Sequence, residues 1–201
     1  MHNSLQSYLK NNYSKYLDGK KEISKYINEQ VLIARNTLIV KDIIEVLPLY
    51  KKDDNLIRER YAQHCVSLLN LFTQYKLLTK GIKDKVIYYS TGEEISVPDL
   101  AQTGKDATEI FKEISPRIKE KITGYVFAMK VGSQFVLMNL VLQLDLPYNN
   151  HPEIIPKISR STKKYINSLV RRRFLKSVAV VNKRILLFER TSIESPKGPN
   201  K

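Results

Sequence analysis

A basic helix that leads directly into two short apolar strands limits the possible folds of this chain more than any other feature. The helical pattern covers residues 161–173, and strand-like runs cover residues 177–181 and 184–189. Only Asn182 and Lys183 separate these runs, which is the spacing of a tight β-hairpin. We therefore predict that the helix and the hairpin pack together around one small core.

The same segment carries most of the positive charge of the chain. Residues 160–201 contain twelve Lys or Arg and two acids, a net charge of +10, whereas residues 1–159 have a net charge of only +4. The total of +14 indicates a polyanionic partner, with nucleic acid as the first candidate and an acidic membrane surface as the second. Because the charge is concentrated in one segment, we expect the contact surface to lie there.

Length and residue usage exclude several classes of protein. A chain of 201 residues with 42% apolar residues is large enough for one or two domains with a hydrophobic core. A single Cys excludes an intramolecular disulfide framework, and the three His are too scattered to form a metal site with it. The longest apolar stretch, residues 135–142, is too short to span a bilayer, and the N-terminal residues lack the apolar region of a secretory signal. We expect an intracellular protein that is nuclear in a eukaryote and otherwise cytoplasmic or virus-associated.

The sequence patterns that usually accompany catalysis do not occur in the chain. It contains no phosphate-binding P-loop, no Gly-rich dinucleotide turn, no paired-cysteine zinc spacing and no Gly-x-Ser-x-Gly. His64 and Cys65 are neighbours, but adjacent residues on a helix point about a third of a turn apart and cannot form a catalytic pair with each other. We expect no enzymatic activity, no metal and no cofactor.

The first half of the chain is predicted to be mostly helical. Apolar residues recur at helical spacing in residues 1–33, with an interruption at Asp18–Gly19, and a second helical run covers residues 36–47. A third helix follows, and residues 75–89 then change from a helical to a strand-like pattern. The apolar stripe of the third helix is expected either to pack on the N-terminal helices or to bind a partner subunit. Its candidate partner-binding residues are Ile57, Tyr61, Leu68 and Phe72.

The order of the predicted elements in residues 134–190 is typical of a winged helix. Three helical patterns, at residues 134–144, 151–158 and 161–173, precede the two strands. In such a domain the third helix enters a groove of DNA, and the hairpin, or wing, contacts the flanking backbone. We predict a mainly α protein with small β-hairpins (α+β) that has two winged helix-turn-helix domains plus N-terminal helices. The predicted parts are a helical arm at 1–33, a first winged-helix domain at 34–95, a helical linker at 96–133, a second winged-helix domain at 134–192 and a disordered tail at 193–201.

The predicted third helix of the second domain has an apolar side and a basic side. Ile166, Leu169 and Val170 would pack inward, and the basic side would face DNA. Ser161 would cap the start of this helix and bring its free N–H groups to a phosphate. The candidate nucleic-acid-binding residues are Arg160, Ser161, Lys163, Lys164, Asn167, Arg171, Arg172, Lys176, Lys183, Arg184 and Arg190.

Two of these residues have side chains that can read a base. In the major groove Asn167 suits adenine and Arg171 suits guanine, because each can form two hydrogen bonds with the edge of its base. Position in the sequence does not distinguish base contacts from phosphate contacts. The run Arg171–Arg173 also fits a backbone clamp or a nuclear-import signal.

Two helix-to-strand junctions resemble those of known proteins. The first is Ser-Thr-Lys-Lys-Tyr-Ile-Asn-Ser-Leu-Val-Arg-Arg-Arg-Phe-Leu-Lys-Ser-Val at 161–178, continued by Asn-Lys-Arg-Ile-Leu-Leu-Phe-Glu-Arg at 182–190, and the second is residues 75–89. Both are similar to the winged-helix repeats of the TFIIE-related proteins, which include TFIIE beta and the two-winged-helix subunit of RNA polymerase III. The resemblance covers about a third of the chain, and residues 115–130 have no counterpart in that family. It implies a tandem winged-helix protein and a place in a transcription-initiation assembly.

The sequence therefore predicts a protein that binds double-stranded DNA and acts in transcription initiation or its regulation. The second domain is expected to hold the DNA, because affinity for phosphates increases with the number of cations that contact them. The first domain is expected to bind protein subunits of a transcription or replication assembly. Two alternatives are a basic RNA-binding, nucleocapsid-type protein of a virus or organelle, and a protein–protein assembly module within a larger nucleic-acid complex.

Overall fold

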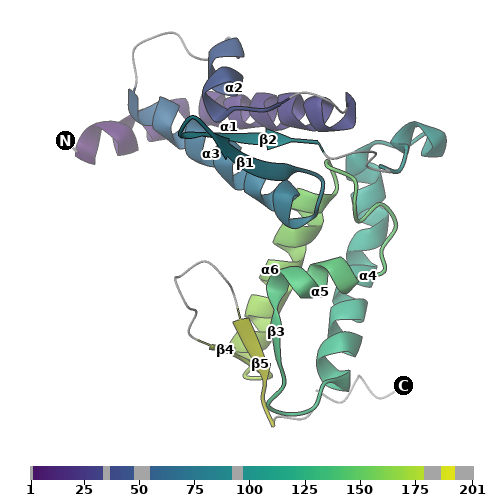
Figure 1. Cartoon of the computed structure of the whole chain (residues 1–201). Coiled ribbons are helices and arrows are strands. Elements are labelled where there is room, and N and C mark those ends of the chain that lie inside the picture. The colour runs from purple at the N-terminus through teal and green to yellow at the C-terminus, as the bar shows by residue number, and fades with distance from the viewer. Residues whose placement is uncertain (1, 34–36, 48–54, 92–96, 179–186, 193–201) are drawn as a thin grey trace. The chain divides into compact units, whose positions relative to one another are not determined.

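The chain is mainly helical with small antiparallel sheets, as predicted, and it forms two compact units, Met1–Val97 and Pro98–Lys201 (Figure 1). The computed structural model describes residues 2–33, 37–47, 55–91, 97–178 and 187–192. Lys183, Arg184 and the predicted disordered tail at 193–201 lie outside the described residues.

The first unit consists of three helices and a hairpin. Its helices are α1 (His2–Ile33), α2 (Val40–Val46) and α3 (Asn55–Gln74), and its strands are β1 (Thr79–Lys83) and β2 (Val86–Ser90). β1 pairs antiparallel with β2, and Leu38 forms an isolated bridge with Tyr89, which places it on the other side of β2. The predicted helix at 36–47 begins only at Val40, because the backbone of Leu38 forms hydrogen bonds with Tyr89 of β2.

α1 is one continuous helix, so the predicted interruption at Asp18–Gly19 was wrong. Gly19 is buried, and a β-carbon at this position would overlap the Tyr61 side chain of α3. The Tyr61 ring also lies 5.3 Å from the Tyr16 ring between centroids. The glycine therefore allows close packing of α1 against α3 and does not end the helix.

Replacing Gly19 with Ala should destabilise the first unit by about 1–2 kcal/mol. Ala is the better helix former by about 1 kcal/mol, but the steric overlap with a buried aromatic ring outweighs this gain. Chemical denaturation measures the change. In a Tyr61→Leu background, where the ring is absent, the same substitution should be neutral or stabilising. A destabilisation of equal size in that background would show that Tyr61 is not the cause.

The apolar stripe of α3 is buried inside the first unit and is not presented to a partner. Ile57, Tyr61, Leu68 and Phe72 are between 0% and 8% exposed. The stripe was offered as a candidate partner-binding surface, and this expectation was wrong because α1 and α2 cover it. A partner of the first unit must use other residues.

Cys65 lies in the same core and is fully buried, and burial raises the pKa of its thiol to about 11. At pH 8 only about one thiol in a thousand is then ionised, and the thiolate is the reactive form. We expect a disulfide reagent to label Cys65 only when the first unit opens. The raised pKa favours the folded state below the ordinary thiol pKa, and this contribution is lost as the pH rises through 11. Rapid labelling of the native protein at pH 8 would contradict the burial.

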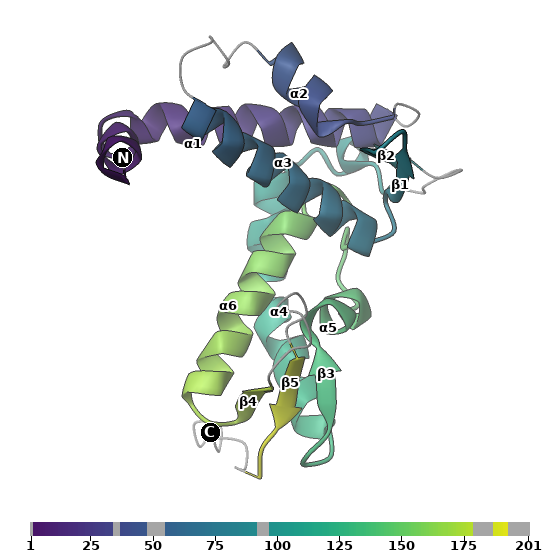
Figure 2. The ribbon, with the colours of Figure 1, turned by 60° about the vertical axis from the view of Figure 1, so that its left-hand side comes forward.

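The second unit also consists of helices and an antiparallel sheet, but its sheet has three strands. Its elements are η1 (Leu100–Thr103), α4 (Ala107–Ala128), β3 (Gln134–Val136), α5 (Leu137–Gln143), α6 (Ile155–Arg171), β4 (Leu175–Val178) and β5 (Leu187–Arg190). The strand order is β3-β5-β4, and all pairs are antiparallel. In both views the strands lie near the C-terminal end of α6, and α4 runs beside α6 (Figures 1 and 2). A hydrogen bond of 2.7 Å between Thr123 and Tyr165 joins these two helices.

Several predicted boundaries in the second unit differ from the structure. Residues 96–133, predicted as a linker, contain α4, whose buried side chains contribute to the core of this unit. The helix predicted at 134–144 begins with a strand, because Phe135 pairs with Phe188. The helices predicted at 151–158 and 161–173 are the single helix α6, since Pro156 is tolerated in the first turn and no residue after it breaks the helix.

The two units repeat the same order of elements. Each has a helix, a short strand or bridge, a short helix, a longer helix and a hairpin. A shift of 97 residues relates α2 to α5 and relates the bridging Leu38 to Phe135 of β3. Lys80 of β1 likewise corresponds to Ser177 of β4, and their strand partners Tyr89 and Phe188 are 99 residues apart, because the second hairpin is two residues longer.

The same shift superimposes α3 and α6 in register. The buried residues Tyr61, Cys65, Leu69 and Phe72 correspond to Ile158, Thr162, Ile166 and Leu169. Both helices end in a Schellman motif, in which Leu77 donates to the Phe72 carbonyl at 2.9 Å and Phe174 donates to the Leu169 carbonyl at 3.0 Å. The outward positions of α3 and α6 can therefore be compared one by one.

Candidate nucleic-acid interface

α6 has one side in the core and one side in solvent. Ile158, Thr162, Ile166 and Leu169 are at most 1% exposed. The exposed side, here named the cationic face of α6, consists of Arg160, Lys163, Lys164, Asn167 and Arg171. These residues recur at intervals of three and four, so they lie in one stripe along the helix.

The four cations of this face have no ion-pair partner in the part of the chain that the structure describes. None has a carboxylate oxygen within 4.0 Å among the residues that the structure describes. α6 itself contains no Asp or Glu. The face therefore presents uncompensated positive charge to solvent, which is the arrangement that binds a row of phosphates.

The equivalent face of α3 shows that the fold does not require these cations. The residues of α3 at the five equivalent positions are Gln63, Val66, Ser67, Asn70 and Gln74. Four of these side chains are exposed like their counterparts in α6, and none is charged. A helix in the same place in the same kind of unit thus has no charge on this face. The cations of α6 are better explained by a ligand than by folding.

Asn167 differs from its counterpart Asn70 in what it can bind. The Tyr89 hydroxyl donates a hydrogen bond of 3.1 Å to the Asn70 side-chain oxygen, so this amide is engaged inside the first unit. The residue equivalent to Tyr89 is Phe188, which has no hydroxyl group. Asn167 is exposed, and its amide is available for an external partner.

The C-terminal end of α6 extends the positive surface. Arg171, Arg172 and Arg173 are all exposed, and the Arg172 guanidinium lies 5.0 Å from the centroid of the Phe174 ring. Arg173 has a left-handed φ of 63° because it occupies the position after the helix end that glycine usually takes. The backbone here directs the three guanidinium groups outward at the start of the hairpin.

Lys176 is exposed but has a partner within the sheet. Its Nζ lies 2.7 Å from Oε1 of Glu189, and Gln134 donates a hydrogen bond of 2.8 Å to the other carboxylate oxygen. These two bonds lower the pKa of Glu189. Lys176 therefore contributes less free charge than the residues of α6.

Arg190 is a structural residue, so its proposed role in nucleic-acid binding was wrong. It is 6% exposed, and its Nη1 donates to the carbonyls of Phe174 at 3.3 Å and Thr191 at 2.8 Å. Its guanidinium also lies 4.5 Å from the centroid of the Phe127 ring. Arg190 joins the last strand to α4 and to Phe174, between α6 and β4.

Ser161 also differs from its predicted role. It lies in the second turn of α6, because the helix begins at Ile155, and it is only partly exposed. Its side chain is therefore not a cap, and the free N–H groups at the start of α6 are not beside it.

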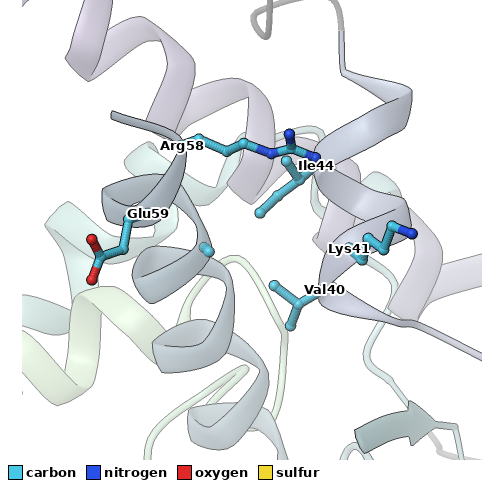
Figure 3. A pocket seen from close by; sticks show the side chains of 6 residues that line it. Val40, Lys41, Ile44, Arg58 and Glu59 are labelled. Atoms are coloured by element: carbon cyan, nitrogen blue, oxygen red, sulfur yellow. The ribbon is translucent and has the colours of Figure 1, made fainter. Parts of the chain in front are cut away.

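A shallow groove between α2 and α3 was not anticipated. It has a volume of about 390 Å³, and Val40, Ile44 and Ala62 provide its apolar walls. Lys41 and Arg58 stand at its edge (Figure 3). Both also reach the Glu45 carboxylate, at 3.8 Å and 3.7 Å. No sequence pattern predicts this groove, since it forms only where two helices meet.

Comparison with protein-family models, with curated proteins and with solved structures gives no match. None of the described helices is both long and apolar enough to cross a membrane. Over the same described residues, no three His, Cys, Asp or Glu side chains are grouped so that they could hold a metal ion.

Proposed function

We propose that this chain is a double-stranded DNA-binding protein with two winged-helix domains, in which the cationic face of α6 contacts the DNA. The order α4, β3, α5, α6, β4, β5 with strand order β3-β5-β4 is the order expected for a winged helix. The first unit has the same order, with Leu38 in place of the first strand. α6 is then the recognition helix of the second unit.

The observation that carries this proposal is the difference between two equivalent helix faces. α6 has Arg, Lys, Lys and Arg where α3 has Gln, Val, Ser and Gln, and both sets are exposed. Four cations on one stripe repel one another in the free protein, so they are unfavourable for the isolated fold. A row of phosphates along this face would offset the repulsion, because each phosphate attracts the cations next to it.

Each residue of the face has a role that fits its chemistry. Arg160, Lys163 and Lys164 suit phosphate oxygens on either side of the major groove, because their side chains are long and cationic. Asn167 and Arg171 lie one turn apart, and their planar side chains suit the edges of adenine and guanine. Arg172 and Arg173 would continue the phosphate contacts toward the hairpin.

The proposed setting is transcription initiation or its regulation. This part of the proposal is supported by the similarity of both helix-to-strand junctions to the TFIIE-related proteins, at residues 75–89 and 161–190. A chain with one DNA-binding unit and one unit whose α3 lacks these cations would join the DNA to a protein assembly.

A competition experiment at fixed salt tests the nature of the nucleic acid. A labelled DNA duplex is bound to the protein, and unlabelled duplex or unlabelled single-stranded RNA is added. We expect the duplex to compete at a concentration at least about tenfold lower, because a rigid helix face matches a groove and not a flexible strand. Equal or better competition by single-stranded RNA would favour the nucleocapsid-type alternative, and no duplex binding at physiological salt would favour a pure assembly module.

A further inference from the structure

Exposed apolar side chains are concentrated in the first unit. Ten large apolar residues are exposed in the described part of the chain, and eight of them belong to this unit. Three belong to the β1–β2 hairpin: Ile82 is 71% exposed, Val86 45% and Ile87 43%. Ile82 and Ile87 share one face of the hairpin and are named the apolar hairpin patch, whereas Val86, which pairs with Lys83, lies on the other face.

The hairpin holds this patch in a defined geometry. Ile82 and Ile87 are directly opposite each other in the β1–β2 pairing, so their side chains share one face of the hairpin. Asp84 and Lys85 both have left-handed φ values, 52° and 64°, which are those of a tight two-residue turn. Tyr89 fixes the base of the hairpin, because it is 1% exposed and donates to Asn70.

Lysines flank the patch, Lys80 on the same face of the hairpin and Lys83 on the other. Lys80, Lys83 and Lys85 are exposed, and the one acid in the hairpin is Asp84. None of the three lysines has a carboxylate oxygen within 4.0 Å in the described ranges of the chain. A ligand that covers the patch must therefore be apolar at its centre and negatively charged around it.

We propose that the apolar hairpin patch binds an acidic, amphipathic segment of another protein. DNA is a poorer fit, because α3 in this unit lacks the cations that α6 has, and aliphatic side chains gain little against phosphates. A membrane surface is also a poorer fit, since two aliphatic side chains bury fewer carbons than one myristoyl chain, which alone gives only marginal binding. An acidic peptide segment provides both apolar contact and carboxylates for the lysines.

This inference does not depend on the DNA-binding proposal. Its test must therefore distinguish binding to the apolar hairpin patch from binding to the cationic face of α6. The bait is the full chain carrying Arg160→Gln, Lys164→Ser and Arg171→Gln, so that acidic peptides cannot bind to α6. A random peptide library displayed on phage is selected on this bait. The selected peptides are then measured against two hairpin variants: one with Ile82→Ser and Ile87→Ser, and one with Lys80→Gln, Lys83→Gln and Lys85→Gln.

We expect the selected peptides to combine Asp or Glu with apolar residues, and each hairpin variant to weaken their binding at least about tenfold. Val131→Ser is the matched control, because Val131 is 62% exposed in the second unit, and it should leave binding unchanged. Circular dichroism verifies that the variants are folded. In a ¹³C-methyl-labelled sample the methyl signals of Ile82 and Ile87 should shift when the peptide is added.

Three results would overturn the inference. One is a selection that yields no peptide or yields peptides without acidic residues. Another is binding that both hairpin variants retain within twofold. The third is a shift of the Ile82 and Ile87 methyl signals with duplex DNA or phosphatidylserine vesicles and not with the peptides. A loss of DNA binding by the α6 variant has no bearing on these results, so failure of either proposal can be recognised separately.

Discussion

Giving α6 the residues of α3 should lower the affinity for duplex DNA by roughly 100- to 1,000-fold at about 0.1 M salt. The variant carries Arg160→Gln, Lys164→Ser and Arg171→Gln. Each lost phosphate contact reduces the release of counterions, which accounts for roughly a tenfold loss of affinity per contact at this salt concentration. The slope of log affinity against log salt should become shallower by about 2.7, because each contact contributes about 0.9.

These substitutions should leave the fold intact, because α3 has the same residues at the equivalent exposed positions. Exposed substitutions of this kind usually change the free energy of unfolding by no more than about 0.5 kcal/mol. The matched control removes three exposed cations from the first unit through Lys21→Gln, Lys25→Gln and Arg60→Gln, which gives the same net charge. Fluorescence anisotropy with a labelled duplex compares the two variants. Equal losses of affinity would mean that net charge, and not the face of α6, determines binding.

Replacing Arg190 with Ala should destabilise the second unit by about 2–4 kcal/mol. The substitution removes a cation stacked on the Phe127 ring and leaves the buried carbonyl of Phe174 without its guanidinium donor. Both losses occur in a nearly dry environment, where such contacts are strongest, while the Phe174 carbonyl keeps the hydrogen bond of 3.1 Å that the Thr191 N–H donates. Chemical denaturation followed by circular dichroism measures the effect.

A comparison with Arg171→Ala distinguishes the two kinds of arginine in this unit. Arg171 is exposed, so its removal should change the free energy of unfolding by no more than about 0.5 kcal/mol while weakening DNA binding. Arg190→Ala should do the reverse at temperatures where the unit remains folded. A stable Arg190→Ala variant with weakened DNA binding would restore the original expectation that Arg190 contacts the DNA.

The α6 face could be predicted because its signal is local. Lys163, Lys164, Asn167 and Arg171 follow helical spacing opposite Ile166 and Leu169, and the structure places them on one exposed stripe. The hairpin after the helix was also predictable, since strand-like residues follow directly. The start of α6 was missed because residues 159 and 160 were read as a break between two helices, whereas they are helical in the structure.

Contacts between distant residues could not be predicted in the same way. The burial of Arg190 depends on Phe127, which lies on α4 in a segment that was read as a linker. The repeat of buried residues every four positions in α4, such as Ile114, Ile118 and Ile122, was visible in the sequence, but Pro116 was read as the start of a new helix. The packing of α1 on the apolar stripe of α3 depends on Gly19, which leaves room for Tyr61. In the sequence alone, Asp18–Gly19 indicates a break in the helix.

Mapping the DNA contact by NMR is the most direct test of the claim that the cationic face of α6 binds duplex DNA. A ¹⁵N-labelled protein is titrated with a short duplex at physiological salt, and the change in each amide signal is measured. We expect the largest changes in amide signal along α6, at Arg160, Lys163, Lys164, Asn167 and Arg171, with little change on α3. Saturable binding that leaves α6 unchanged, or changes of equal size at the equivalent positions of α3, would contradict this claim.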